Sequence, residues 1–105
     1  MRPSANTTTF NERVLELTKR IPRGRVTTYK IIAEKLNTKA YRAVGQALHN
    51  NKRPVIIPCH RVVKSDGSLG GYAKGDEMKM QLLRAEGIEI RDQRIQNFKE
   101  VLFCF

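Results

Sequence analysis

The chain has 105 residues, the size of a single domain that can bury roughly two-thirds of its unfolded surface without staples. We expect neither a secretory leader nor a membrane span, and the two cysteines, Cys59 and Cys104, are expected to stay unpaired, so a soluble intracellular protein follows. The 20 Lys and Arg against 10 Asp and Glu give a net charge of +10, which favours a polyanionic partner.

A polar tail over residues 1–8 precedes the first predicted helix. Thr9 and Glu12 have the spacing of a capping box. The apolar residues that follow recur at helical intervals, at Phe10, Val14, Leu17 and Ile21. The run Pro-Arg-Gly at 22–24 ends this helix, and residues 25–26 can form a short strand.

Two further helices with a tight turn between them are predicted next. Thr27 or Thr28 caps a helix that ends near residues 37–38, and another helix runs from about 39 to 49. This layout is typical of a helix-turn-helix. Small residues cover much of the second of these helices, and they either let its backbone approach a partner surface or only pack against a neighbouring helix.

The second half of the chain predicts a wing and a fourth helix. Residues 55–57 suit a buried extended segment, and Asp66-Gly67 is a strong turn signal that predicts a hairpin over 62–70. A glycine-rich loop over 70–75 lacks the features of a nucleotide phosphate loop. Asp76 can cap a helix that Gly87 ends. The fold class is therefore mainly α: a winged helix-turn-helix-like domain with four to five helices and a short β-hairpin.

The most informative run is Pro58-Cys59-His60-Arg61. Cationic or proton-accepting neighbours lower the pKa of a thiol, and the thiolate is the nucleophile. The competing interpretation is a buried structural cysteine beside an exposed histidine. A metal site built from Cys59, His60, His49 and Cys104 is disfavoured because adjacent Cys and His lack the usual ligand spacing, so no metal is expected.

Positive charge is concentrated between Leu17 and Ser65. This stretch holds twelve basic residues and a single acid, Glu34. Such a field attracts phosphate backbones. No helix in this stretch has a basic face and a bulky apolar face, so nucleic acid is a better partner than a membrane.

Several motifs in order resemble the methylated-DNA-protein cysteine methyltransferases, also called alkylguanine-DNA alkyltransferases. They are GRVTTY at 24–29, RAVG at 42–45, IPCHRV at 57–62, GGY at 70–72, and Lys79 followed by LL at 82–83 and EG at 86–87. The resemblance spans about residues 10 to 88 and corresponds to the family's C-terminal, active domain. The N-terminal domain that many members carry is not matched.

The resemblance implies DNA repair by a single-turnover reaction. The family flips O6-alkylguanine out of duplex DNA and transfers the alkyl group irreversibly to a cysteine, with no metal and no cofactor. By position, Cys59 is the acceptor, His60 the base that removes its proton through a water, and Glu86 the carboxylate that orients His60. Asn51 resembles the family's hinge asparagine, although Lys52 follows it where proline is common.

The same resemblance assigns the DNA-handling residues. Arg42 would fill the gap left by the flipped base, and Tyr29 would rotate the adjoining phosphate. The helix of small residues would lie in the minor groove of double-stranded DNA. The expected DNA contacts are Tyr29, Arg42, Ala43, Gly45, Thr28, Lys39 and Arg61, and the expected base pocket consists of Tyr72, Leu48, Gly70, Gly71 and Val62.

Two other functions remain open: a sensor that binds the lesion without transfer, and a winged-helix regulator in which Cys59 is incidental. We divide the chain into a tail (1–8), an alkyltransferase and DNA-binding domain (9–90) and a C-terminal extension (91–105). Helical spacing in the extension, at Ile95, Phe98, Val101 and Leu102, predicts an amphipathic cover for surface that another domain would bury. We expect a monomer, with a fused or associated repair protein left open, in the cytoplasm or nucleoid of a prokaryote or the nucleus of a eukaryote.

Overall fold

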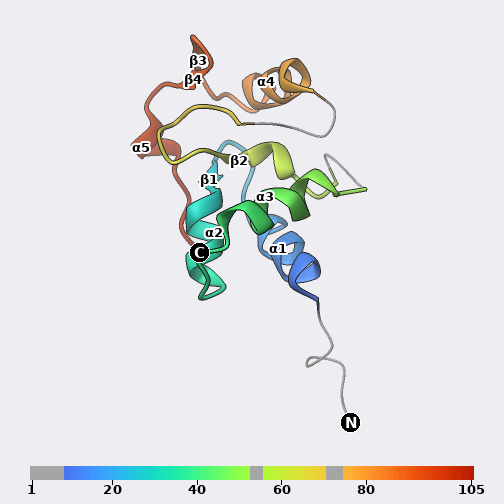
Figure 1. The fold of residues 1–105 in the computed structure, drawn as a ribbon. Helices are drawn as coiled ribbons and strands as arrows, with labels where there is room; N and C mark the ends of the chain where they lie inside the picture. Colours follow the sequence, from blue (N-terminus) through green and yellow to red (C-terminus); the bar gives the residue numbers. More distant parts are fainter. Residues whose placement is uncertain (1–8, 53–55, 71–74) are drawn as a thin grey trace.

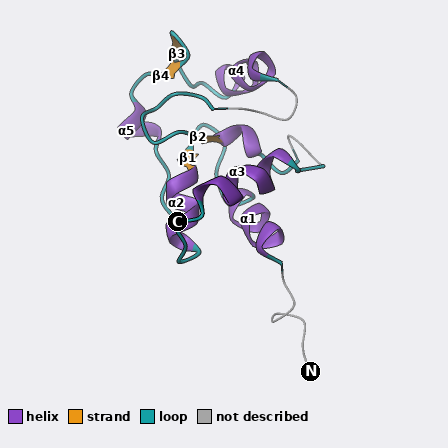
Figure 2. Ribbon diagram, in the orientation of Figure 1, coloured by secondary structure: helices purple, strands orange, loops and turns teal. Residues whose placement is uncertain are grey.

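The computed structural model describes residues 9–52, 56–70 and 75–105 (Figure 1). Short helices dominate these segments, and the strands are only two residues long (Figure 2). This arrangement confirms the predicted mainly helical, winged helix-turn-helix-like class. In chain order the elements are α1 (Phe10–Thr18), β1 (Thr27–Thr28), α2 (Tyr29–Lys35), α3 (Tyr41–His49), a 3₁₀ turn (Cys59–Arg61), β2 (Val62–Val63), α4 (Asp76–Ala85), β3 (Ile90–Arg91), β4 (Arg94–Ile95) and α5 (Phe98–Val101).

The predicted caps form at the first two helices. At α1, Thr9 Oγ1 accepts a hydrogen bond from Glu12 N, and Thr9 N donates to Glu12 Oε1, so the capping box is complete. At α2, Thr28 Oγ1 accepts from Ile31 N. Asn37, with φ of 58°, ends the turn after α2, and α3 begins at Tyr41, two residues later than predicted. The two helices α2 and α3 form the helix-turn-helix.

Two strands that are distant in sequence pair with each other. β1 pairs with β2 in parallel, with Thr27 opposite Val62 and Thr28 opposite Val63. Val62 packs with the cluster formed by α1, α2 and α3, and Val63 packs with a second cluster built on Leu83 and Ile88, because successive strand residues point to opposite faces. The small sheet therefore lies between two apolar cores.

The hairpin predicted over residues 62–70 is wrong in its location. The chain does turn there, since Gly67 has φ of 87° and Lys64 N donates to Ser68 O at 2.9 Å, but β2 pairs with β1 instead. Val62 and Val63 are both fully buried, as is usual for a strand covered on both faces. The observed hairpin is β3–β4, whose turn residues Asp92 and Gln93 both have positive φ, as a tight hairpin turn requires.

The C-terminal segment also differs from the amphipathic helix predicted for it. Ile95 belongs to β4, and α5 is a single turn. The chain then runs along β1: Val26 N donates to Val101 O at 2.9 Å, and Phe103 N donates to Val26 O. The Arg25 guanidinium donates to the carbonyl oxygens of Val101 and Leu102. The tail thus adds a short extended segment to the sheet. Backbone hydrogen bonds to Val26 and side-chain hydrogen bonds from Arg25 hold it there.

Removing residues 98–105 should therefore destabilise the domain. The truncation exposes the backbone at Val26 and removes Phe98, Phe103 and Phe105, which pack against the two cores. We expect the melting temperature to fall by about 10 °C, because about 1 kcal/mol corresponds to several degrees in a domain of this size. Circular dichroism measures the transition, and the exposed Cys104 changed to alanine serves as the control. An unchanged midpoint in the truncated protein would show that the tail is not part of the folded unit.

Candidate active site

Cys59 begins the 3₁₀ turn, and its side chain is only 5% exposed. The buried segment predicted just before it, over residues 55–57, is wrong at Ile56: Ile57 is buried, Ile56 is 76% exposed, and Val55 lies outside the described residues. The Asn51 side-chain amide donates to Cys59 Sγ at 3.3 Å and to Ile57 O at 3.0 Å. Asn51 is itself buried and lies two residues beyond the end of α3. The helix-turn-helix is therefore linked to the thiol through one amide, and the structure brings these two predicted residues together.

His60 follows Cys59 on the same turn and contacts a carboxylate from the end of α4. His60 Nε2 lies 2.9 Å from Glu86 Oε2, and the imidazole is almost fully buried. Glu86 caps the C-terminal end of α4, where the following Gly87, with φ of 90°, ends the helix as predicted. The His60–Glu86 contact has the geometry expected of a base and the group that orients it.

Arg61 completes this cluster from the other side. Its Nε donates to Glu86 Oε1 at 2.9 Å, its Nη2 to Oε2 at 2.7 Å, and its Nη1 to Ile21 O at 2.8 Å. The side chain is 15% exposed, so the cation for which we expect a DNA contact is used inside the protein. Gly24 N also approaches Glu86 Oε1, at 3.4 Å.

Burial sets the protonation states of the cluster. It raises the pKa of the Cys59 thiol, and the hydrogen bond from Asn51 and the charge of Lys79 only partly counter this effect. The prediction that neighbours leave the thiol with a lowered pKa is therefore wrong in sign. Burial, together with the charges of Arg61 and Lys79, lowers the pKa of His60 more than Glu86 raises it. At neutral pH a protonated thiol thus lies next in the chain to a neutral imidazole.

The charge of Glu86 decides which imidazole nitrogen can act as the base. Burial would raise the pKa of Glu86, but hydrogen bonds from Arg61 and His60 outweigh it and lower the pKa. A charged carboxylate accepts hydrogen bonds, so Nε2 of neutral His60 carries the hydrogen and Nδ1 carries the lone pair. The cluster holds an imidazole that can accept a proton at Nδ1.

Lys79 is a site residue to which the sequence analysis gave no role. It is fully buried in α4, and its Nζ donates to Val62 O at 2.7 Å and lies 6.0 Å from the centre of the Tyr29 ring. Burial lowers its pKa to about 8, an effect that the Cys59 thiolate charge would oppose. The sequence did contain a signal for the burial of Lys79. This lysine lies four residues before Leu83 and therefore on the same, inward face of the helix.

Tyr29 and Gly70 form one wall beside this lysine. A Cβ built on Gly70 would lie 2.9 Å from the Tyr29 hydroxyl, and Gly70 has φ of 72°, so a side chain is excluded there. Burial raises the pKa of Tyr29 to about 12, which keeps the phenol protonated. Leu48 and Val62 are buried in the core beneath. Two residues expected in the base pocket, Gly71 and Tyr72, lie outside the described residues.

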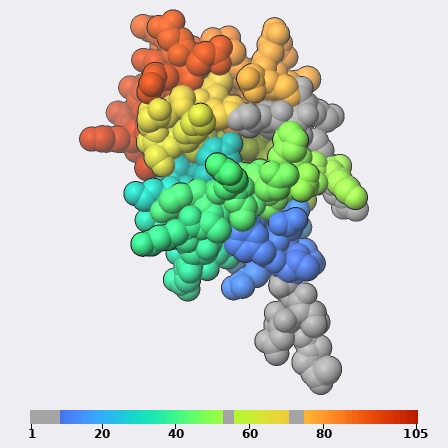
Figure 3. Space-filling model, viewed as in Figure 1, coloured from blue at the N-terminus to red at the C-terminus, as the bar shows by residue number. Residues whose placement is uncertain are grey.

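Three of the seven residues expected to contact DNA lie on α3, which is at the surface of the molecule between α1 and the segment that follows β2 (Figure 3). Arg42 is exposed, and Ala43 and Gly45 are half-buried. A Cβ built on Gly45 would meet nothing within 4 Å, so no neighbouring helix requires this glycine. Thr28 is buried at its cap. Two interpretations were open for the small residues of α3. Ala47 is buried and packs inside the protein. For Gly45 the other interpretation, close approach of the helix backbone to a partner, stays a prediction.

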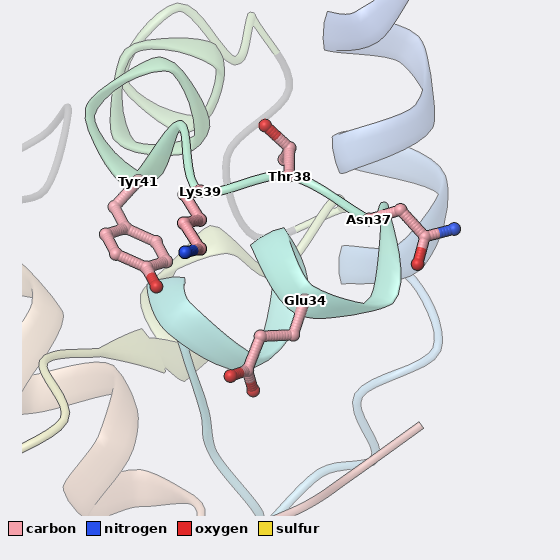
Figure 4. A pocket seen from close by; sticks show the side chains of 5 residues that line it. All are labelled: Glu34, Asn37, Thr38, Lys39 and Tyr41. Carbon is pink, nitrogen blue, oxygen red and sulfur yellow. The ribbon is translucent and has the colours of Figure 1, made fainter.

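Lys39 lies in the turn before α3, at the edge of a hollow. The hollow is lined by side chains from the end of α2, the turn and the first residue of α3, namely Glu34, Asn37, Thr38, Lys39 and Tyr41 (Figure 4). Lys39 is exposed, and Tyr41 is 41% exposed. No group of three His, Cys, Asp or Glu side chains able to hold a metal occurs in the described ranges, and no described helix is long and apolar enough to cross a membrane.

Comparison with known proteins gives a consistent set of similarities. Residues 9–88 match the family model described as 6-O-methylguanine DNA methyltransferase, DNA binding domain. A methylated-DNA–protein-cysteine methyltransferase of Pyrobaculum aerophilum is 50% identical over 91 residues, covering 79% of this chain and 61% of that protein. The crystal structure of the O6-methylguanine-DNA methyltransferase of Pyrococcus kodakaraensis has a TM-score of 0.70 at 49% identity, covering 77% of this chain and 47% of that one.

A third similarity extends along the whole chain. The crystal structure of S. pombe Atl1, in complex with damaged DNA containing O6-carboxymethylguanine, has a TM-score of 0.80 at 28% identity and covers 98% of both chains. In contrast, the chain spans only about half to three-fifths of the length of the two methyltransferases. The C-terminal segment after residue 88, which lies outside the family model, is thus included in the match to Atl1.

Proposed function

The chain belongs to the 6-O-methylguanine DNA methyltransferase family, and on that premise we propose that it repairs DNA by moving the alkyl group of O6-alkylguanine to Cys59 Sγ. The observation that carries this proposal is the buried Cys59–His60 pair on one turn, with Asn51 on the sulfur and Glu86 on the imidazole. The lesion is flipped out of the duplex to reach this thiol, since the sulfur cannot contact a base inside the stack.

The chemical step follows from the protonation states. His60 Nδ1 takes up the thiol proton through a water, and Glu86 stabilises the imidazolium that forms. The thiolate then attacks the alkyl carbon, so that the S–C bond forms as the C–O6 bond breaks. The leaving guanine regains a hydrogen on N1, which balances the proton lost from sulfur. The thioether is stable, so each molecule reacts once.

DNA is held by α3 and the residues around it. Gly45 lets the helix backbone approach the minor groove, and exposed Arg42 enters the stack where the lesion leaves. The phenol of Tyr29 stays protonated next to the pocket wall at Gly70, where it can turn the adjoining phosphate. Such a substrate places the protein with the genome, in the cytoplasm or nucleoid of a prokaryote or the nucleus of a eukaryote.

A second candidate function is lesion binding without transfer. The observation that favours it is the match to S. pombe Atl1 over 98% of both chains. The presence of a thiol with a base beside it favours transfer instead. If the protein were a sensor, it would hold the lesion for another pathway and leave the alkyl group on the guanine.

One experiment separates the two functions. The protein is incubated with duplex DNA that carries a radiolabelled methyl group on guanine O6, and the label on protein and on DNA is measured after denaturation. Transfer predicts label bound covalently to the protein, with at most one label per molecule. Tight binding of the duplex with all label left on the DNA would support the sensor and contradict transfer.

Arg42 provides a test of base flipping. Arg42→Ala should slow transfer from duplex DNA by at least about tenfold and leave reaction with the free base O6-methylguanine within about twofold, because only the duplex substrate pays an unstacking cost of a few kcal/mol. Lys99→Ala, which removes an exposed cation on α5, is the control for general charge loss. Equal losses on duplex and free base would contradict a role for Arg42 in flipping.

A further inference from the structure

Arg61 occupies both oxygens of the carboxylate that orients the base. Its guanidinium forms a two-pronged contact with Glu86, with N–O distances of 2.9 and 2.7 Å, and its third nitrogen is fixed by Ile21 O. The Glu86 side chain is only 6% exposed, so water replaces little of this interaction. Glu86 Oε2 is shared, because it accepts from Arg61 and also contacts His60 Nε2.

This sharing addresses a conflict in the chemistry of the site. A carboxylate within hydrogen-bond distance of a histidine favours the charged imidazolium. An imidazolium already carries both protons and cannot accept one from Cys59. The site therefore needs a carboxylate that fixes the ring orientation without protonating the ring before the reaction.

We propose that Arg61 is a positioning residue that neutralises Glu86 in the resting site, so that Glu86 orients His60 and leaves it uncharged until it takes the thiol proton. The inference rests on the proposed transfer function, because that reaction requires a neutral base. It assigns to Arg61 an internal role in place of the DNA contact expected from the sequence. The side-chain hydrogen bonds of Arg61 to a charged group go to Glu86, and through this carboxylate Arg61 acts on His60.

Apart from the Arg61–Glu86 pair, the charged group that acts on His60 is Lys79, and its effect has the same direction as that of Arg61. Lys79 of α4 is a buried cation that also disfavours a charged imidazole, and Glu86 is the carboxylate that favours it. The segment after α1 contributes Ile21 O and Gly24 N to the Arg61–Glu86 pair, and neither group titrates. Arg23 donates to Ala85 O, beside Glu86 but not on its carboxylate.

The direct test is a titration of His60 by NMR, in the unmodified protein and in Arg61→Gln. In the unmodified protein, the His60 midpoint should lie below the value of ~6.5 for a free histidine. In Arg61→Gln, the His60 midpoint should rise by about one pH unit or more, the size of effect expected from an adjacent charge. Arg23→Gln is the matched control and should leave the midpoint in place.

Two results would overturn the proposal. One is a His60 midpoint that is unchanged in folded Arg61→Gln. The other is a His60 midpoint above ~6.5, the value for a free histidine, in the unmodified protein. That result decides the question even if Arg61→Gln does not fold. Either measurement is independent of alkyl transfer, so a failure of the proposed function itself would be seen separately, in the label experiment.

A kinetic measurement extends the test to the reaction. The single-turnover rate of the unmodified protein should fall as the pH drops through the His60 midpoint, because the protonated ring cannot accept the thiol proton. In Arg61→Gln this fall should begin about one pH unit higher. A purely structural role would lower the rate by the same factor at every pH, and that result would contradict the proposal.

Discussion

Cys59→Ala should abolish alkyl transfer while leaving lesion binding within about threefold of the unmodified protein, a difference below about 1 kcal/mol. In the proposed reaction the sulfur is the atom to which the new bond forms, and alanine has no atom that can replace it as the acceptor of the Asn51 hydrogen bond. The side chain is small and 5% exposed, so its loss removes little of the surface that holds DNA. Single-turnover label transfer and a duplex-binding titration measure the two quantities.

The second cysteine makes this test specific. Cys104→Ala removes an exposed thiol near the C-terminus and should leave transfer unchanged. If label were found on Cys59→Ala protein and were absent from Cys104→Ala protein, the acceptor would be Cys104 and not Cys59. A loss of binding as large as the loss of transfer in Cys59→Ala would indicate instead that the fold had changed.

His60→Gln should slow transfer at pH 7 by about 10²–10⁴-fold, the usual contribution of a general base. Glutamine keeps a donor for Glu86 and similar volume but has no nitrogen that accepts a proton. Because burial raises the pKa of Cys59, most of the thiol is protonated at pH 7 and depends on His60 for its activation. Single-turnover rates measured across the pH range give the size of the effect.

The pH dependence of this variant has a definite sign. As the pH rises toward the pKa of the thiol, solvent removes the proton without His60, so the rate of His60→Gln should approach that of the unmodified protein. His49→Gln, at the exposed end of α3, is the control and should behave like the unmodified protein. A constant ratio of the two rates from neutral to alkaline pH would contradict the role of His60 as the base.

Local patterns predicted the helical half of the fold. The capping box at Thr9 and Glu12, the cap at Thr28 and the stop at Gly87 each depend on residues within a few positions of one another. The pairing of β2 with β1 joins positions 35 residues apart, Thr27 with Val62, and nothing local encodes it. From the sequence alone, Val62 and Val63 fit the first strand of a hairpin over 62–70 equally well.

The C-terminal segment shows the same limit more clearly. Spacing at Ile95, Phe98 and Val101 fits a helix, yet the chain forms a hairpin, one helical turn and an edge segment. The main-chain groups of Val26 decide this outcome, because they accept and donate hydrogen bonds along the edge of β1. Tertiary contact overrode a periodic pattern that was only about two turns long.

For the site, the sequence brought forward candidate residues but not their charge states. The run around Cys59 and the family resemblance brought forward Cys59, His60, Glu86 and Asn51, and the structure pairs Asn51 with Cys59 and His60 with Glu86. The direction of the thiol pKa could not be read in this way, because burial is a property of the whole fold. Nor could the sequence tell that the cation of Arg61 points inward.

The central claim is that Cys59 Sγ receives an alkyl group from a guanine in DNA, and mass spectrometry of the intact protein tests it most directly. The protein is mixed with an excess of duplex carrying O6-methylguanine, freed from DNA and digested. The molecule should gain one methyl group in place of one hydrogen, and the gain should map to the peptide containing Cys59. Folded protein of unchanged mass, after the lesion has been bound, would contradict it.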